Sequence, residues 1–337
     1  MINSVIKGIG INLPERLVTS QEAEKLANYE KFGLHYGLCK MLTGCETRHY
    51  VADGEYSSDL AYKAGKQALE NAGIDPSEVD ALLFCSVTHD FAEPATANVV
   101  ADKLNVRNAF VFDIKNACNA FISGVDVADS FIKSGKAKTV LVVSGEAMSR
   151  WTKFDYDDKK EMMQRAPVTL SLGDGGGAFV LQAEESDTPN GILKTYFHTY
   201  SEKWKNNVVW GGGVMYPRDP EKMYIPGTTK EIIDMQVTAV GEAFPKIFGA
   251  TGLTLDDVDC LVPSQVAKWV ATNVIKEMHM NPEKVISVVE KYGNVGASNI
   301  PLATYEAVST GKLKKGDTVL FYGGAVGISA GAILAKF

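Results

Sequence analysis

One of the five cysteines stands where a catalytic nucleophile is expected. Cys118 lies in the stretch KNACNAF, after the apolar run AFVFDI and before the helical pattern FISGVDVADSFIKSG. A helix start carries unpaired amides and the positive end of the helix dipole, which favour a thiolate and lower the pKa of the thiol. Its small neighbours Ala117 and Ala120 leave room for a substrate carbonyl, and the amide of Cys118 can donate to a developing oxyanion. The pattern predicts attack by Cys118 on a carbonyl carbon.

The other cysteines are predicted to be structural. A free cysteine usually behaves as a small buried hydrophobic side chain and is inert. The total is odd and no CxxC pair occurs, so neither a disulfide framework nor a zinc site is indicated. We therefore expect no bound metal and buried thiols at Cys39, Cys45, Cys85 and Cys260.

The elements that position Cys118 occur twice along the chain. Three segments of the first half have a counterpart in the second half, in the same order: 73–83 with 252–262, 110–135 with 287–311, and 138–145 with 317–324. Each copy alternates helical patterns with short apolar runs, which favours mixed or parallel sheets covered by helices on both faces. The sequence thus predicts an α/β protein built from two copies of one module, each with two strands before a helix of about five turns.

The duplication suggests a second site residue. When the long helices of the two copies are aligned on their final glycines, Gly135 and Gly311, Cys118 falls on Asn294. Equivalent helix starts face each other in a fold with pseudo-two-fold symmetry. Cys118 and Asn294 are therefore candidates for one shared site.

Composition narrows the possible functions. The 337 residues are 45% hydrophobic and carry a net charge of -7, with no basic stripe that would bind a phosphate backbone. The N-terminal residues lack the charged and apolar regions of a signal peptide, and no apolar run approaches the roughly 20 residues of a membrane span. We expect a cytoplasmic protein that binds neither nucleic acid nor membrane. The glycines of GDGGG (173–177) lack a P-loop lysine and are better explained by close strand–helix packing.

Several stretches resemble one enzyme family. KNACNAF is similar to the active-site turn of the 3-oxoacyl-acyl carrier protein synthase III family, within the thiolase superfamily, and the stretches LGDGGGAFVLQ (172–182), LVPSQVA (261–267) and YGNVGASNIPLA (292–303) also match in order. The resemblance covers essentially the whole chain. It implies a thiolase-like fold of duplicated α/β halves in a five-layered αβαβα arrangement, with the nucleophile half at 1–183 and the asparagine half at 184–337.

The resemblance also implies a chemistry. Members of the family load an acyl group from a thioester onto the cysteine and usually condense it with a second acyl unit. Carried over to this chain, Cys118 is the nucleophile, Asn294 donates to a substrate carbonyl, and the amide of Gly324 or Ala325 joins that of Cys118 in an oxyanion hole. An acyl-CoA or acyl-carrier-protein thioester is then the substrate, and no permanently bound cofactor is expected.

The histidine of the family is missing. Ser264 stands at its position, and a serine hydroxyl cannot hold a proton near pH 7 as imidazole does. Decarboxylative condensation by the usual mechanism is therefore in question. His89 and Glu93 are candidate replacement bases, because their segment resembles the one that crosses the dimer interface of relatives and reaches the partner's acyl tunnel. Phe91, in the same segment, is a candidate substrate-binding residue.

Substrate delivery also departs from the family pattern. Arg150 matches an arginine that contacts the CoA nucleotide, but Leu38 stands where acetyl-CoA-using relatives carry a tryptophan. Ala267 stands where relatives carry an asparagine, and Trp269 stands where they carry a basic residue. Two of the usual contacts to pantetheine or to the carrier protein are thus absent. A carrier-protein donor is consequently at least as well supported as free CoA. The variable segment 200–225 is interpreted as a cap over the acyl tunnel.

Two hypotheses of different class follow. The first is a homodimeric acyltransferase of the synthase III type that passes its acyl group to carbon or to a heteroatom in fatty-acyl or polyketide-type biosynthesis. The second is a non-catalytic or acyl-storing subunit that pairs with an active homologue. The presence of Cys118 and Asn294 favours the first, and the missing histidine favours the second.

Overall fold

Two β-sheets form the framework of the molecule. The computed structural model describes residues 1–227 and 230–337, apart from the side chains of 230–237 and 240. The first sheet has the strand order β1-β7-β6-β4-β5 and the second has the order β8-β11-β10-β9. The strands of the first sheet are β1 (Ile2–Asn12), β4 (Ala81–Cys85), β5 (Phe110–Ile114), β6 (Thr139–Ala147) and β7 (Asp174–Glu185). Those of the second sheet are β8 (Ile192–Thr199), β9 (Cys260–Pro263), β10 (Thr318–Ala325) and β11 (Ser329–Lys336).

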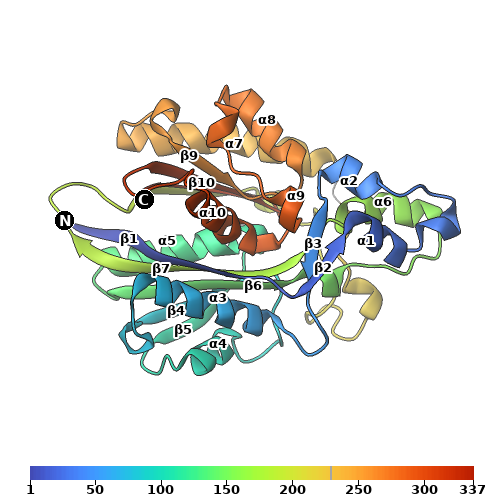
Figure 1. The fold of residues 1–337 in the computed structure, drawn as a ribbon, viewed down its shortest axis with the longest axis horizontal. Coiled ribbons are helices and arrows are strands. Elements are labelled where there is room, and N and C mark those ends of the chain that lie inside the picture. Colours follow the sequence, from blue (N-terminus) through green and yellow to red (C-terminus); the bar gives the residue numbers. More distant parts are fainter. Residues whose placement is uncertain (228–229) are drawn as a thin grey trace.

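Helices cover both sheets on both faces. The outer layers hold α3 (Ser57–Ala72) and α4 (Ala97–Leu104) on the first sheet, and α7 (Lys230–Thr251) and α8 (Lys268–Met278) on the second. Between the sheets lie α5 (Ala120–Lys133) and α10 (Asn299–Ser309), each of which packs on strands of both sheets. Figure 1 shows the resulting order of helix, sheet, helix, sheet and helix. The predicted five-layered α/β fold is confirmed.

A side layer projects from this framework. It contains the two-stranded ribbon of β2 (Arg16–Thr19) and β3 (Thr47–Tyr50), together with α1 (Ser20–Leu26), α2 (Leu38–Thr43) and α6 (Lys159–Thr169). These elements share a buried cluster that includes Tyr29, Tyr50 and Tyr156. The short helix α9 (Val289–Tyr292) contacts β3 and joins this layer to the region of α10.

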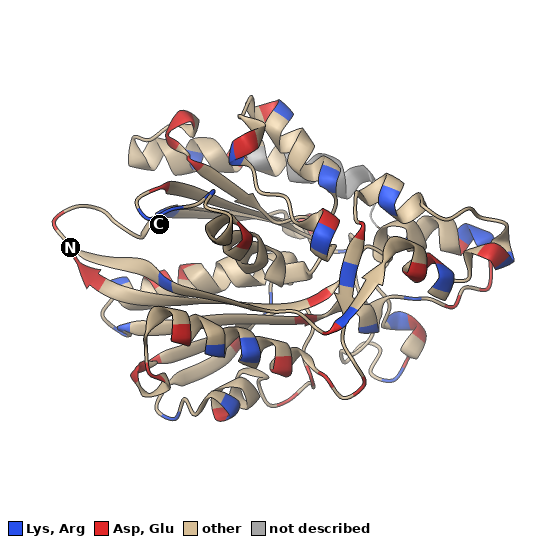
Figure 2. Cartoon of the chain, in the orientation of Figure 1, with Lys and Arg blue, Asp and Glu red and all other residues tan. Residues whose placement is uncertain are grey.

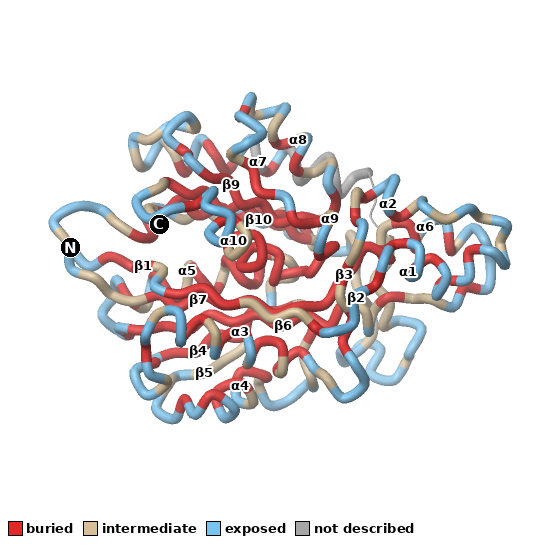
Figure 3. Tube along the Cα trace, viewed as in Figure 1, coloured by how far each residue is buried: buried red, intermediate tan, exposed pale blue. Residues whose placement is uncertain are grey.

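The sequence of the strands explains their burial. The strands β4, β9 and β10 carry no charged residue, and every residue in them is buried. Figure 2 shows the charged residues gathered on the outer helices and connections, and Figure 3 shows the same central strands as buried tubes. Because both faces of each sheet are covered, these strands are apolar throughout, without the alternation of a half-exposed strand.

The glycines of β7 permit two close contacts. A Cβ on Gly176 would lie 2.3 Å from the carbonyl oxygen of Leu60 in α3, and a Cβ on Gly177 would lie 2.3 Å from the ring of Pro301 in α10. A side chain at either position would collide with the helix. The predicted role of the GDGGG stretch in close packing is confirmed at these two positions.

The two copies differ in their details. The helices α5 and α10 have 14 and 11 residues, fewer than the five turns predicted. The second copy also lacks the second predicted strand, because Val285 makes only an isolated bridge to Leu261. The strand β7 continues to Glu185, past the boundary expected after residue 183. The division of the chain into two equivalent halves stays a proposal from sequence.

Candidate active site

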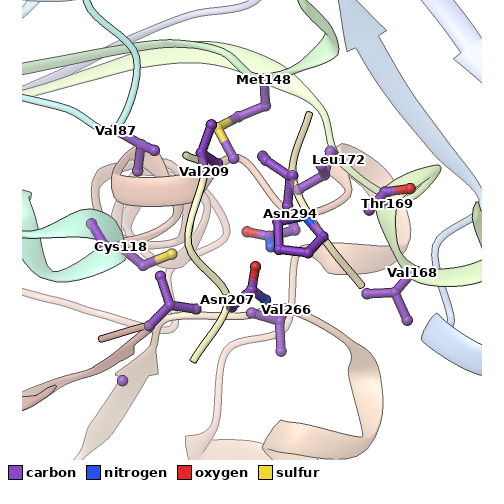
Figure 4. Close-up of a pocket in the computed structure, with 15 residues that line it drawn as sticks. Val87, Cys118, Met148, Val168, Thr169, Leu172, Asn207, Val209, Val266 and Asn294 are labelled. Atoms are coloured by element: carbon purple, nitrogen blue, oxygen red, sulfur yellow. The ribbon is translucent and has the colours of Figure 1, made fainter. Parts of the chain in front are cut away.

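Cys118 and Asn294 line the same pocket. The cavity has a volume of about 90 Å³ and lies where the starts of α5 and α10 meet the carboxyl end of β10. Its wall is largely aliphatic and holds no charged side chain among the described residues (Figure 4). The residues around it are Val87, Ala117, Cys118, Met148, Val168, Thr169, Leu172, Asn207, Val209, Ile225, Pro226, Val266, Asn294, Gly324 and Val326.

A tight turn presents Cys118 to this pocket. The chain leaves the strand β5, forms a single 3-10 turn at Ala117–Asn119 and enters α5 at Ala120. Ala117 has a φ of 47°, in the left-handed region that costs a residue with a Cβ free energy. The turn leaves Cys118 partly exposed, and its sulfur is directed into the cavity (Figure 4). The predicted position at a helix start is therefore observed, with one 3-10 turn before the α-helix.

The pKa predicted for Cys118 is wrong in direction. Burial is the main cause that raises the pKa of the thiol to about 12, and the nearby carboxyl group of Glu146 raises it further. A hydrogen bond from the amide of Cys118 itself acts in the opposite direction but is the smallest of the three causes. The sequence argument considered the helix start alone. In the folded protein, Cys118 is a neutral thiol at pH 7.

Asn294 is held rigidly by its backbone and by its side-chain oxygen. Its amide donates to the carbonyl of Ser171 over 2.8 Å, and its carbonyl accepts from the amide of Gly173 over 2.9 Å. Its Oδ1 accepts from the amide of Gly296 at 3.1 Å and from Nδ2 of Asn299 at 2.9 Å. Since the oxygen is engaged, Nδ2 is the group of Asn294 that can donate to a bound molecule.

Asn299 belongs to a buried network that the sequence did not reveal. Its Oδ1 accepts from the amide of Val295 at 3.0 Å, and its Nδ2 also donates to the carbonyl of Gln265 at 3.0 Å. Gln265 is itself fixed, because its Oε1 accepts from the amides of Val288 and Val289. Both side chains are fully buried. The only signal in the sequence was a second asparagine five residues after Asn294.

Ser264 does not reach the pocket. It is buried beside Gln265, and its amide donates to the carbonyl of Tyr322 over 2.7 Å. Its hydroxyl has no hydrogen-bond partner within the described chain, and Ser264 is not among the residues around the cavity. Val266 lines the wall in this region instead. The assignment of Ser264 to the site therefore stays a prediction from sequence.

The candidate oxyanion residues occupy the end of β10. Gly324 borders the cavity, whereas Ala325 is buried and is absent from the described cavity wall. Asn119, directly after the nucleophile, donates from Nδ2 to the carbonyl of Ser329 at 3.1 Å and so ties the turn to β11. Gly324 is consequently the better placed of the two candidate amides.

The loop with His89, Phe91 and Glu93 lies away from the pocket of its own chain. Asp113 on β5 anchors both ends of this loop, because it lies 3.2 Å from Nδ1 of His89 and accepts from the amides of Thr96 and Ala97 at 2.8 Å each. Phe91 and Glu93 are exposed between these anchors. None of the three candidates borders the described cavity.

Arg150 and Leu38 lie outside the pocket as well. The guanidinium group of Arg150 donates to the carbonyl of Ala52 over 2.9 Å and lies 3.6 Å from the carboxylate of Asp53. Leu38 begins α2 and is half-buried, near the exposed side chains of Met41 and Leu42. The side chains of Leu38, Met41 and Leu42 are apolar and offer a nucleotide no charged group.

Glu146 connects three segments that meet at the site. Its carboxylate accepts from the amides of Val87 and Thr88 at 2.8 and 3.0 Å and from the amide of Ala297 at 3.0 Å. Burial raises its pKa to about 7, although these hydrogen bonds favour the charged form. Sequence reasoning missed this residue because it stands inside a strand, with partners far away in the chain.

The segment predicted to be a cap forms one wall of the cavity. Asn207, Val209 and Ile225 of this segment line the cavity, together with Pro226 directly after it. Its tip is more exposed, with Val214 and other large apolar side chains in contact with solvent. The structure therefore places the segment beside the candidate nucleophile, as the cap interpretation requires.

No metal centre accompanies the site. Among the side chains that the structure describes, no group of three His, Cys, Asp or Glu is arranged to hold a metal ion. The described helices also include none that is long and apolar enough to span a membrane.

Comparisons with known proteins identify related sequences. Residues 112–201 match the model of the 3-oxoacyl-[acyl-carrier-protein] synthase III family, and residues 248–337 match the model of the C-terminal part of the same family. The chain is 32% identical to a beta-ketoacyl-[acyl-carrier-protein] synthase III of Agrobacterium fabrum over 340 residues, covering 100% of both chains.

Solved structures give the same result. The crystal structure of 3-oxoacyl-[acyl-carrier-protein] synthase III from Aquifex aeolicus is similar with a TM-score of 0.85 and 28% identity, covering 99% of this chain and 100% of that chain. A variant of OleA from Xanthomonas campestris shares the fold, with a TM-score of 0.89 at 23% identity over 99% of this chain and 98% of that chain.

Proposed function

We propose that Cys118 takes an acyl group from a CoA or carrier-protein thioester, because the chain belongs to the 3-oxoacyl-[acyl-carrier-protein] synthase III family, whose members are acyl-transferring condensing enzymes. The observation that carries the proposal is the convergence of Cys118 and Asn294, which are far apart in the sequence, on one aliphatic cavity. An uncharged acyl chain fits that wall, since burying it removes apolar surface from water.

The loading step follows from the groups around the sulfur. The sulfur of Cys118 attacks the thioester carbonyl, the bond from carbon to the departing sulfur breaks, and the proton of Cys118 ends on the departing thiol. Cys118 and Gly324 both line the cavity, and we assign to their amides the stabilisation of the tetrahedral oxyanion. The raised pKa of Cys118 makes the thiolate scarce at pH 7 but strongly nucleophilic once it forms.

The second step transfers the acyl group from Cys118 to an acceptor. Asn294 supports this step, because its Nδ2 is free to donate to a carbonyl while its oxygen is held by Asn299 and Gly296. The acceptor is either the α-carbon of a second acyl unit or a heteroatom.

We further propose that the protein acts as a homodimer. The strand β5 is at the edge of its sheet, and its first residue, Phe110, is 55% exposed beside Phe112 and Phe131. An apolar edge strand is a template for pairing with a second chain. Because Asp113 of β5 anchors the loop with Phe91 and Glu93, pairing at β5 would carry that loop toward the partner's site.

The experiment is intact-protein mass spectrometry after incubation with acetyl, butyryl, hexanoyl and malonyl thioesters of CoA and of carrier protein. The wild type should gain one acyl mass from at least one donor, and Cys118→Ala should gain none. The acetyl to hexanoyl series also measures the chain length that the cavity accepts.

The second hypothesis, a non-catalytic partner subunit, makes the opposite prediction. The thermal melting curve shows whether the wild-type protein is folded. A folded wild-type protein that gains no mass from any donor would contradict acyl loading. Such a subunit would need its dimer interface but no reactive thiol.

A further inference from the structure

The polar groups around the cavity are few and unlike one another. Only four of the described residues around it carry a polar side chain: Cys118, Thr169, Asn207 and Asn294. Thr169 uses its hydroxyl proton on the carbonyl of Arg165, 3.0 Å away. Asn294 offers Nδ2, a donor, because its oxygen is occupied by Asn299 and Gly296. The side chain of Asn207 therefore decides which further polar group the cavity can bind.

Asn207 presents an acceptor. Its backbone has a φ of 61°, a left-handed conformation that asparagine adopts more readily than most residues. Its Nδ2 donates to the carbonyl of Gly227 over a long 3.5 Å. Figure 4 shows the side-chain oxygen of Asn207 directed toward the space between Cys118 and Asn294. The site thus pairs one donor, on Asn294, with one acceptor, on Asn207.

We infer that Asn207 binds the acyl acceptor through its Oδ1, and that the acceptor is accordingly a neutral nucleophile with an N–H or O–H group. This inference rests on the proposed acyl loading of Cys118 and specifies the second substrate of the same site. Asn207 would orient the nucleophilic nitrogen or oxygen beside the acyl carbonyl, while Asn294 donates to that carbonyl.

A malonyl unit fits these groups poorly. Its carboxylate and its carbonyls are all hydrogen-bond acceptors, so they would face the oxygen of Asn207 without a shared proton. A neutral amine or alcohol can donate its proton to that oxygen.

The transfer balances without a further base. The nucleophile forms a bond to the acyl carbon, the bond between that carbon and the sulfur of Cys118 breaks, and the proton of the nucleophile returns to the released thiolate. Because the pKa of the Cys118 thiol is raised, the released sulfur is a strong base. This accounts for a site in which none of the described residues around the cavity is a histidine.

The test uses the full-length protein loaded on Cys118, freed of excess donor and then mixed with aniline, an aromatic amine that is neutral at pH 7.5. We expect loss of the acyl mass with formation of the anilide. Asn207→Ala, incubated with donor until it carries the acyl mass, should lose that mass to aniline at least tenfold more slowly than the wild type. Asn207→Asp retains an acceptor oxygen and should transfer faster than Asn207→Ala.

Asn206→Ala is the matched control. Asn206 is the neighbouring asparagine, is similarly half-buried and does not border the cavity, so its replacement should leave transfer at the wild-type rate. Transfer by Asn207→Ala at the wild-type rate would overturn the inference. Release of CO₂ and condensation with malonyl-CoA, without transfer to aniline, would overturn it as well. A wild-type protein that never gains the acyl mass would instead refute the loading step itself.

Discussion

Nδ2 of Asn299 donates a hydrogen bond of 2.9 Å to Oδ1 of Asn294. This contact fixes which end of the Asn294 amide faces the cavity. Without it, the amide could turn and present an acceptor where a substrate carbonyl needs a donor. Asn299 is therefore a positioning residue, which acts on the reaction only through Asn294.

Replacement of Asn299 should separate the two half-reactions. Asn299→Asp keeps the shape but places an oxygen against Oδ1 of Asn294, so we expect acyl transfer from Cys118 to slow by about a hundredfold, the loss typical of one removed donor. Loading of Cys118 should continue. The measurement is a single-turnover mass spectrometric assay of both steps. Equal losses in loading and transfer would indicate a general structural defect.

Loading of Cys118 should depend on pH in one direction. Because the pKa of the thiol is raised to about 12, the thiolate fraction grows about tenfold for each pH unit in the range below the pKa. We expect the rate of acylation to rise steadily between pH 6.5 and 9. The rate is measured with a fixed acyl-CoA, with Cys118→Ala as the blank for donor hydrolysis. A plateau below pH 8 would show that the thiol ionises far more easily than its surroundings indicate.

Ser264→Ala should stabilise the protein without changing acyl loading. The hydroxyl of Ser264 is buried and has no partner among the described residues, so its removal relieves a desolvation cost of about 1 kcal/mol. The free energy of unfolding is measured in urea. Thr304→Val is the matched control, because the buried hydroxyl of Thr304 donates to the carbonyl of Ile300 and its loss should be neutral or destabilising. A loss of loading in Ser264→Ala would assign Ser264 a direct role.

Stability should fall as the pH rises from about 4.5 to 7. Burial raises the pKa of Glu146 from 4.5 to about 7, so in this window the native state holds a proton that the unfolded chain has released. Asp174, whose pKa burial raises to about 6, adds to the effect at the acid end. Each group contributes a slope of at most about 1.4 kcal/mol per pH unit. Urea unfolding at several pH values measures the slope, and Glu146→Gln should flatten it.

Phe110→Glu should weaken the dimer. A charge at the exposed start of β5 opposes pairing of this edge with a second chain. Leu17→Glu, on the ribbon strand β2, is the matched control, because Leu17 is also 55% exposed. Sedimentation of both variants and of the wild type measures the mass in solution. A Phe110→Glu variant that stays dimeric at low micromolar concentration would place the interface elsewhere.

The order of elements and the pairing of Cys118 with Asn294 could be predicted from sequence. Apolar runs and the glycines that end helices are local signals in the sequence. Because these signals occur twice in the same order, aligning the two copies predicted that the two helix starts lie close together. The same reasoning misjudged the length of both helices, because a helix start depends on the turn that precedes it and not on periodicity alone.

The properties set by distant neighbours could not be predicted. The pKa of Cys118 depends on burial and on Glu146, which no local pattern connects to it. Ser264 was assigned to the site by its place in a motif, yet its side chain does not border the cavity. Asn207 lies in a segment without periodicity, and only the folded chain shows that it faces the nucleophile.

The close contacts of Gly176 and Gly177 restrict which residues the framework around the cavity can accept, whereas another part of the cavity wall is free of this restriction. A single added methyl group on β7 would displace α3 or α10, and the start of α10 follows directly from the turn that holds Asn294. The wall contributed by residues 207–226 carries no such constraint from a packed helix. A mutagenesis library aimed at new acyl donors or acceptors should therefore be confined to this wall, where size and polarity can change while the framework of the sheets is kept.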